Sequence, residues 1–320
     1  MTDPSVSRTR VAGYLLALGA GATWGTTGPL STGLYDLMPA TSIGFWRVLI
    51  GTVALAIWGI LFRRELFRAD RRGWLLIGLG GGALVALFEI AYQFAIGGVG
   101  VAGAAALLYT APVIVAVLAR IILKEGLTAT RIALAVVVMI GVSLTVTGGS
   151  NAGAEAARMG IAAGVAGGLL SALSYALTSL MGRYAAPRYG VVRVLFLEAV
   201  GGVLLIWIAL AIWGRAPQVP PSAAAWRGLL GLAAGSVIAA NLFFFGAMKR
   251  IEAAPASVAA TIEPVVGALL ALLLFSQRLT ALGWLGLMLV VGGVAAGYWL
   301  EGLKQQLDPQ AEHPGRPVGE

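Results

Sequence analysis

Long apolar segments, separated by short polar or charged connections, run along nearly the whole chain. They lie near residues 11–30, 40–62, 73–95, 100–119, 130–148, 159–182, 191–213, 226–248, 255–275 and 279–300. Each is about as long as the roughly 20 residues that a helix needs to cross the hydrocarbon core of a bilayer. A membrane barrel would instead show alternating segments of about ten residues. The pattern therefore predicts ten transmembrane helices.

Composition supports this assignment and narrows the chemistry. Of the 320 residues, 59% are hydrophobic and 11% are charged, whereas a soluble globular chain is about one quarter charged. We therefore expect an all-α polytopic membrane protein. The chain has no cysteine, and its only histidine, His313, follows the last apolar segment. Disulfides are excluded, and we expect no metal site and no cofactor.

Basic residues give the expected orientation. The formal net charge is +8, but most Lys and Arg lie in connections between apolar segments, which indicates membrane orientation rather than nucleic-acid binding. With the N-terminus inside, 17 of these residues fall on the cytoplasmic side and 4 on the other, while Arg47 lies within a span. Residues 1–10 and 301–320 are then cytoplasmic. The tail at 301–320 is polar, and we expect it to be disordered.

An internal repeat determines the expected architecture. A shift of 152 positions aligns the third to fifth segments with the eighth to tenth without a gap, from Glu89 opposite Asn241 to Gly141 opposite Gly293. We therefore expect two repeats of five helices, at 11–148 and 159–300, joined by a loop at 149–158. Because five is odd, the second repeat enters the membrane from the opposite side. Transporters with such inverted repeats bind substrate near the midplane at the repeat interface.

The most similar parts of the two repeats are Pro112 to Thr128 and Pro264 to Thr280, each a proline, an apolar helix and a Leu-Thr pair. With these motifs and Ala22-Thr23-Trp24-Gly25, the chain resembles EamA-type ten-helix exporters of the drug/metabolite transporter superfamily, over nearly all of residues 11–300. Within this family it is most similar to YddG-like amino-acid exporters. The first copy keeps the family's acid at Glu125, whereas the second has Gln277, which weakens a shared role for this acid.

Ionisable side chains within apolar segments are candidate functional groups, because charge is costly at bilayer depth. Glu89 and Tyr92 lie on one helix face, and their partners in the second repeat are Asn241 and Phe244. A carboxylate on one side of the pseudo-two-fold axis and an amide on the other fit an asymmetric ligand, such as an amino acid with an ammonium group. The alternative is packing alone. Arg47 and Glu198, matched in a weaker alignment, are expected to form buried ion pairs or hydrogen bonds.

Two prolines mark expected helix breaks. Pro112 and Pro264 occupy matched positions, and each removes a helical donor, so we expect kinked helices that line the pathway and take part in gating. The alternative is a kink that packing absorbs. Four further side chains are expected to contact substrate, although aromatic residues also populate membrane interfaces: Trp24, Tyr109, Tyr175 and Glu263.

The resemblance implies a secondary transporter in a bacterial inner membrane that exports small metabolites, most often amino acids including aromatic ones. Lipid-linked carrier flippases and nucleotide-sugar carriers are the alternatives, but a polyanionic substrate would require more intramembrane cations than Arg47. The expected partners are a small-molecule substrate and the bilayer, and both a monomer and a homodimer fit the sequence. An intramembrane protease is disfavoured, because every aspartate lies outside the apolar segments: Asp3, Asp36, Asp70 and Asp308.

Overall fold

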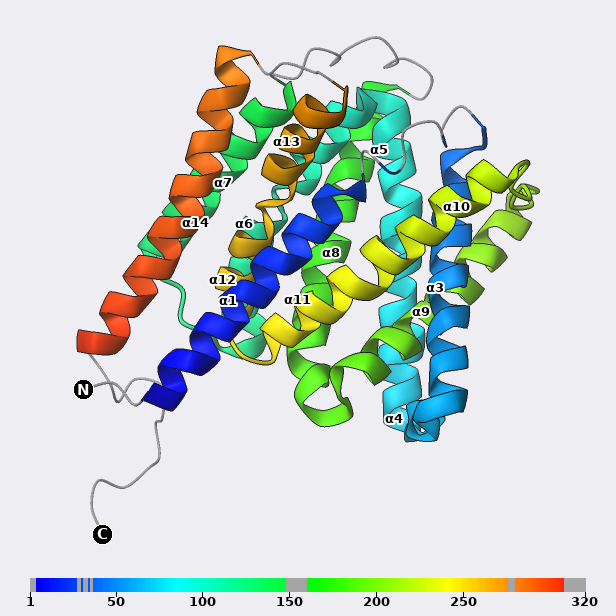
Figure 1. Cartoon of the computed structure of the whole chain (residues 1–320), viewed down its shortest axis with the longest axis horizontal. Coiled ribbons are helices and arrows are strands. Elements are labelled where there is room, and N and C mark those ends of the chain that lie inside the picture. The colour runs from blue at the N-terminus through cyan, green and yellow to red at the C-terminus, as the bar shows by residue number, and fades with distance from the viewer. Residues whose placement is uncertain are drawn as a thin grey trace.

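The structure is a computed structural model that describes residues 4–27, 30, 34, 37–147, 160–275 and 280–307. These residues form helices and connections, without a strand among them (Figure 1). Five helical stretches are long and apolar enough to cross a membrane: Thr41–Phe62, Arg71–Ala95, Ile161–Tyr189, Val191–Ile212 and Ala223–Met248. The all-helical fold expected from the hydropathy pattern is thereby confirmed.

The helices follow one another as two sets. The first set contains α1 (Pro4–Gly25), α3 (Ala40–Phe62), the short η1 (Arg64–Phe67), the joined helices α4 (Arg71–Gly73), η2 (Trp74–Gly81) and α5 (Gly82–Leu108), then α6 (Ala111–Leu118) with η3 (Ala119–Leu123), and α7 (Ala129–Thr147). The second set contains α8 (Ile161–Tyr189), α9 (Val191–Ile212), the joined helices α10 (Ala223–Leu232), η4 (Ala233–Ala239) and α11 (Ala240–Met248), then α12 (Ala253–Ala260), α13 (Glu263–Phe275) and α14 (Ala281–Leu307).

The first helices of the two sets run in opposite directions. Gly13, in the first half of α1, packs against Ile251, because a Cβ at this glycine would lie 2.6 Å from the Ile251 side chain. Arg183, late in α8, donates to the carbonyl of Met248 at 2.7 Å. Helix α1 therefore begins on the side of the molecule where α8 ends, as inverted repeats require.

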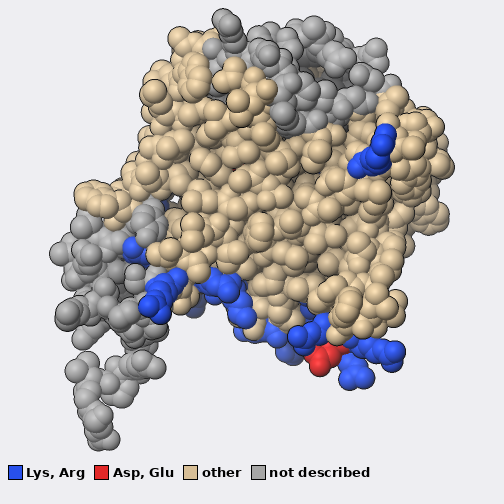
Figure 2. All heavy atoms as spheres, viewed as in Figure 1, with Lys and Arg blue, Asp and Glu red and all other residues tan. Residues whose placement is uncertain are grey.

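Lys and Arg gather on this same side of the molecule. Figure 2 shows most of the visible basic side chains along the edge where α1 begins and α14 ends in Figure 1. We call this side the basic face. Its position at one end of the helices agrees with charges that remain in water at a membrane boundary.

Equivalent helices pack in equivalent ways around the two sets. Helix α1 packs on α11 and α8 packs on α5, which are corresponding pairs when the first set is matched with the second. Helices α7 and α14, the last of each set, lie side by side (Figure 1). Gly141 allows the backbones of this pair to come close, since a Cβ there would lie 2.8 Å from the carbonyl oxygen of Gly286. The two repeats therefore share a common packing scheme.

Two boundaries differ from the sequence prediction. Separate helices were expected at 73–95 and 100–119, but α5 continues through Gly82–Leu108. The interval 96–107 contains no proline and no charged residue, so nothing in it interrupts the backbone hydrogen bonds. Helix α14 also continues to Leu307, although the tail from 301 was expected to be disordered. Residues 301–307 include good helix formers, and those from 308 lie outside the described residues.

Candidate functional site

Three aromatic side chains meet between the two repeats. Trp24 lies on α1, Tyr175 on α8 and Phe244 on α11. The ring centroid of Trp24 lies 6.0 Å from that of Tyr175 and 5.2 Å from that of Phe244. The centroids of Tyr175 and Phe244 are 5.7 Å apart. At a shift of 151 positions, Trp24 of the first repeat lies opposite Tyr175 of the second. Their contact places this trio, the aromatic cluster, at the repeat interface.

A π-helical segment positions Trp24. In η4, the backbone N–H of Ala240 donates to the carbonyl of Gly235, a wide turn of the kind often found at functional sites. The carbonyl oxygen of Ser236 accepts hydrogen bonds from the Trp24 indole N–H at 3.1 Å and from the Asn241 side chain at 3.0 Å. Asn241 also donates to the carbonyl of Val237 at 3.0 Å. Asn241 therefore supports the backbone that orients Trp24.

Arg47 on α3 forms an ion pair with Glu89 on α5. Both side chains are largely buried, with 20% and 10% of their surface exposed. Gly44, one turn before Arg47, makes room for the carboxylate, because a Cβ there would lie 2.7 Å from the Glu89 Oε2 atom. The prediction that Arg47 joins a buried ion pair agrees with this geometry. The sequence prediction for Glu89 did not include this partner.

Glu198 does not share the ion pair of its repeat partner Arg47. It lies on α9 and is 3% exposed, and its Oε2 atom has no hydrogen-bond partner among the described residues. The expected buried ion pair is therefore wrong for Glu198. The physical reason is that α9 presents this side chain to η2, which carries no ionisable residue.

Both helices with the matched prolines are broken at matched positions. Tyr109–Thr110 separates α5 from α6, and Thr261–Ile262, 152 positions later, separates α12 from α13. The backbone N–H groups of Thr110 and Thr261 donate to carbonyls three residues earlier, at 3.1 and 3.2 Å. Their hydroxyls donate to the same carbonyls, of Leu107 and Val258. Threonine thus closes the first half of each helix, one turn or less before the proline.

Helix α1 packs directly on the second of these breaks. A Cβ at Gly25 would lie 2.6 Å from the carbonyl oxygen of Glu263, and one at Gly21 would overlap the carbonyl oxygen of Ala260. Pro264 has no N–H group to donate to the carbonyl of Ala260, four residues earlier. This carbonyl faces the backbone of α1, at a distance that only glycine permits.

Polar groups connect with the aromatic cluster. Glu263 on α13 interacts electrostatically with Tyr175 of the cluster, with Tyr109 and with Arg47. Tyr92, which stacks on Phe88 with centroids 5.8 Å apart, interacts electrostatically with Tyr109. These interactions link Tyr92, Tyr109 and Glu263 to the aromatic cluster, and the ion pair of Arg47 extends the link to Glu89.

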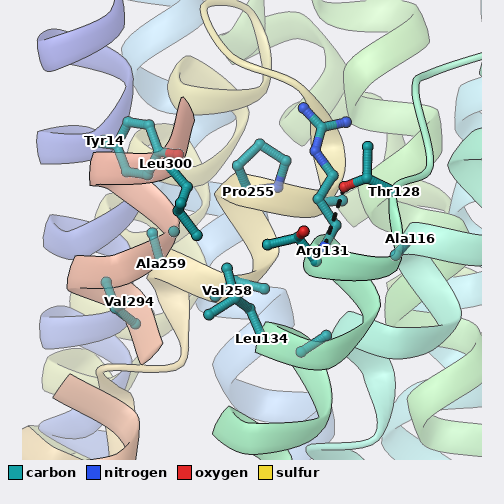
Figure 3. A pocket seen from close by; sticks show the side chains of 14 residues that line it. Tyr14, Ala116, Thr128, Arg131, Leu134, Pro255, Val258, Ala259, Val294 and Leu300 are labelled. Carbon is teal, nitrogen blue, oxygen red and sulfur yellow. Dashed lines mark hydrogen bonds between the residues drawn. The ribbon is translucent and has the colours of Figure 1, made fainter. Parts of the chain in front are cut away.

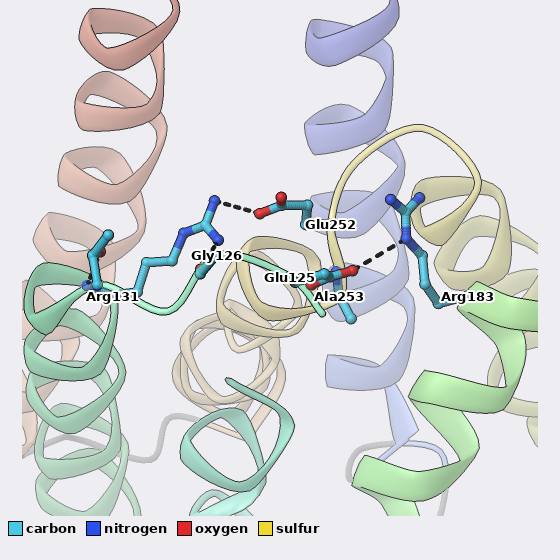
Figure 4. A network of polar contacts seen from close by, with 7 residues as sticks. Glu125, Gly126, Arg131, Arg183, Glu252 and Ala253 are labelled. Carbon is cyan, nitrogen blue, oxygen red and sulfur yellow. Dashed lines mark hydrogen bonds and ion pairs between the residues drawn. The ribbon is translucent and has the colours of Figure 1, made fainter. Parts of the chain in front are cut away.

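A second polar cluster on the basic face was not anticipated. The Glu125 carboxylate accepts from the backbone N–H of Ala253, at 3.2 and 3.1 Å to its two oxygens, and from Arg183 at 3.3 Å. Arg131 forms an ion pair with Glu252 beside it (Figure 4). Glu125 and Arg131 belong to the first repeat, and the other three to the second. We call these five residues the basic-face network, and it ties the repeats together at the N-terminus of α12.

The family acid Glu125 was the sequence signal for this network, but its partners are far away in the chain. Glu125 precedes α7, whereas Arg183 lies on α8 and Ala253 begins α12. A carboxylate at a helix N-terminus is stabilised by the helix dipole and by the unpaired N–H groups. Gln277, at the corresponding position of the second repeat, lies outside the described residues.

We expect the thermal stability of the protein to depend on pH through Glu125. Burial, with repulsion from Glu252, raises the pKa of Glu125, against the hydrogen bonds from Ala253 and Arg183. Between the ordinary and the raised pKa, the folded protein binds more protons than the unfolded chain. Its free energy of unfolding therefore falls as pH rises through this window, and is constant above it. Melting curves from about pH 4 to about pH 8 should show less of this slope in Glu125→Gln, and an unchanged slope would contradict the assignment.

A cavity of about 230 Å³ lies beside this network, between α1, α7, α12 and α14 (Figure 3). Apolar side chains such as Leu134, Val258 and Val294 line most of it, and Thr128 and Arg131 lie at one end. The aromatic cluster is not part of its lining. The sequence prediction did not place a site here, because these helices are far apart in the chain and individually unremarkable in composition.

The geometry defines a class of protein: a polytopic helical membrane protein built from two inverted repeats with an aromatic and polar region between them. The profile of the EamA-like transporter family matches residues 11–147 and 162–298. The chain therefore belongs to the EamA-like transporter family, within the drug/metabolite transporter superfamily, whose members are transporters rather than enzymes.

Comparison with solved structures supports the fold. One, described only as a crystal structure of a protein, has a TM-score of 0.78 and 20% sequence identity, and the match covers 92% of this chain and 99% of that chain. At this identity the likeness concerns the fold alone. A search of curated proteins gives no match.

Proposed function

We propose that the protein is a secondary transporter that exports small amphipathic metabolites, chiefly amino acids including aromatic ones, by alternating access. The observation that carries the proposal is the aromatic cluster of Trp24, Tyr175 and Phe244 at the repeat interface. Inverted-repeat transporters bind substrate at this interface and expose it alternately to the two sides as the repeats rock.

An acidic and a basic group beside the aromatic cluster favour a zwitterion. The carboxyl group of Glu263 and the guanidinium of Arg47 interact electrostatically and border the same region. The ammonium group of an amino acid can bind to Glu263 or to an aromatic face, and its carboxylate can bind to Arg47. An aromatic or aliphatic side chain can meet the rings of the cluster. The resemblance to YddG-like exporters supports the same substrate class.

The orientation and energy source follow from the sequence. We place the basic face in the cytoplasm of a bacterial cell, with both termini there, since cytoplasmic loops of membrane proteins carry an excess of Lys and Arg. The sequence has no Gly-x-x-x-x-Gly-Lys-Ser/Thr element for binding ATP. Uphill transport therefore uses an ion gradient or the gradient of the substrate.

Counterflow in proteoliposomes tests the proposal. Liposomes preloaded with unlabelled tryptophan, phenylalanine or leucine should accumulate the same labelled amino acid, whereas liposomes preloaded with a nucleotide sugar should not accumulate labelled nucleotide sugar. Exchange of the nucleotide sugar without exchange of any amino acid would overturn the substrate class and favour the polyanion alternative.

We expect Trp24→Leu to weaken tryptophan binding about two- to ten-fold. The change removes ring contacts worth about 0.5–1.5 kcal/mol beyond the buried area. Trp58→Leu is the matched control, because Trp58 lies on α3 with 39% of its surface exposed. The measurement is the half-saturation concentration for tryptophan in the counterflow assay, and equal values for the two variants would remove Trp24 from the site.

A further inference from the structure

Glu198 is a buried carboxyl that the proposed binding region does not use. It is 3% exposed, and its Oε2 atom has no hydrogen-bond partner among the described residues. Burying an ionised carboxylate without a partner is so unfavourable that such a group normally becomes neutral. Intramembrane ionisable residues with this environment are functional candidates.

The neighbours of Glu198 come from both repeats. Gly81 of η2 faces it, because a Cβ at Gly81 would lie 3.1 Å from the Glu198 Cβ, 3.7 Å from its Oε2 and 2.9 Å from the Met181 sulfur. Close by, Gly82 and Gly201 bring the backbones together, since a Cβ at Gly82 would lie 2.5 Å from Gly201. Glu198 is therefore sealed inside a tight contact between the first repeat and the second.

The ion pairs between described residues do not include this carboxyl. Helix α9 packs against η2, α5, α3, α8, α11 and η1. Neither η2 nor α11 has an ionisable side chain. The ionisable groups on α9 and on its other neighbours are Arg193, Arg47, Glu89, Tyr92, Tyr175, Arg183, Tyr184, Arg188, Tyr189, Arg64 and Glu65.

We propose that Glu198 is a proton-binding site whose protonation is coupled to closure of the contact between α9 and η2. In the closed contact the carboxyl carries a proton. When the repeats move apart and water enters, the O–H bond breaks, the proton passes to water and the carboxylate is hydrated. Closure requires the reverse step, so each cycle binds and releases one proton. Only this link to the transport cycle rests on the proposed function.

The route for the proton is short. Glu198 lies seven residues after Val191, where α9 begins, which corresponds to about 10 Å along the helix. The beginning of α9 follows directly on the end of α8 and therefore lies at the basic face. A proton that enters or leaves through this face need cross only about two helical turns.

Infrared spectroscopy of the purified protein in nanodiscs tests the site without any substrate. Wild-type protein at neutral pH should show a C=O band of a protonated carboxyl that shifts in D2O, and the difference spectrum between wild type and Glu198→Gln should contain this band, whereas bands of the other buried carboxyls, Glu125 and Glu263, cancel. Glu89→Gln is the matched control and should retain the band, since Glu89 is ion-paired with Arg47. Glu198→Asp, which keeps a carboxyl, should restore a band. Identical spectra for wild type and Glu198→Gln would overturn the proposal.

Transport measurements test the coupling. Glu198→Gln should retain amino-acid counterflow, but the accumulation of amino acid driven by a pH gradient should fall at least ten-fold. The amide has the size and neutrality of the protonated acid, so we expect the variant to fold. Unchanged pH-driven accumulation would overturn the coupling. If no amino acid is transported by wild type while the infrared band depends on Glu198, the proposed substrate class fails and the proton site stands.

Discussion

Replacing Glu89 by Leu is expected to lower the free energy of unfolding by about 3–5 kcal/mol, because it breaks the buried ion pair with Arg47. A Leu side chain fills much of the space of the carboxylate, so the lost charge compensation dominates the effect. The measurement is reversible unfolding in detergent, or the melting temperature where unfolding is irreversible. The exposed acid of η1 gives the control variant Glu65→Leu, which should change stability by less than about 1 kcal/mol.

The double variant Glu89→Leu/Arg47→Met separates structural from functional roles. Replacing both partners of a buried ion pair by apolar groups is often neutral or stabilising, so stability should recover. Transport should not recover, since the polar region beside the aromatic cluster has lost both charges. Full transport by a stable double variant would show that the ion pair only holds α3 against α5.

Replacing Pro112 or Pro264 by Ala is expected to slow transport while keeping or raising the melting temperature. The structure breaks both helices at matched positions, at Tyr109–Thr110 and Thr261–Ile262. Proline is tolerated in the first turn of a helix, where both prolines lie, but it costs about 3 kcal/mol in the interior of a continuous helix, and alanine removes that cost and restores a backbone donor. A bias of this size towards a continuous helix would shift a two-state equilibrium by about 100-fold. One access state would then dominate, and turnover would fall in proportion.

The measurement is the initial transport rate per correctly inserted molecule, beside the melting temperature, for both single variants and the double variant. A structural kink predicts the reverse pattern, with altered stability and normal turnover. Normal turnover in all three proteins would exclude the helix breaks as part of the gate.

The helical fold could be predicted from the sequence because lipid offers no hydrogen bonds. Every membrane-spanning segment must therefore pair its own backbone N–H and C=O groups, as a helix does. The same rule explains the wrong boundary between the third and fourth helices. Hydropathy identifies the segments whose side chains must remain in water. The glycines near 97–100 resemble a turn in composition, but no charged residue there has to reach water, so the helix continues. At the matched positions of the second repeat, Lys249, Arg250 and Glu252 are charged, and the chain does turn.

The repeat alignment correctly predicted which residues occupy equivalent positions in the two repeats, but it did not predict which residues interact with each other. It related Trp24 to Tyr175, which touch, and Pro112 to Pro264, which follow matched breaks. It could not give the Arg47–Glu89 ion pair, because partners within one repeat leave no mark on an alignment between repeats. Nor could it give the basic-face network, whose members are brought together by the packing of α8 beside η3 and of α12 beside α7.

Alternating access requires the two repeats to move against each other, and a cross-link across the basic-face network tests this motion most directly. Arg131 and Glu252 form an ion pair between the repeats, and the chain has no cysteine, so Arg131→Cys/Glu252→Cys is the only reactive pair. A bifunctional thiol reagent of the length of the ion pair should hold the basic face closed, and a cleavable version should allow release. We expect amino-acid counterflow to stop on cross-linking and to return on cleavage. Counterflow at the full rate in quantitatively cross-linked protein would contradict alternating access by these repeats.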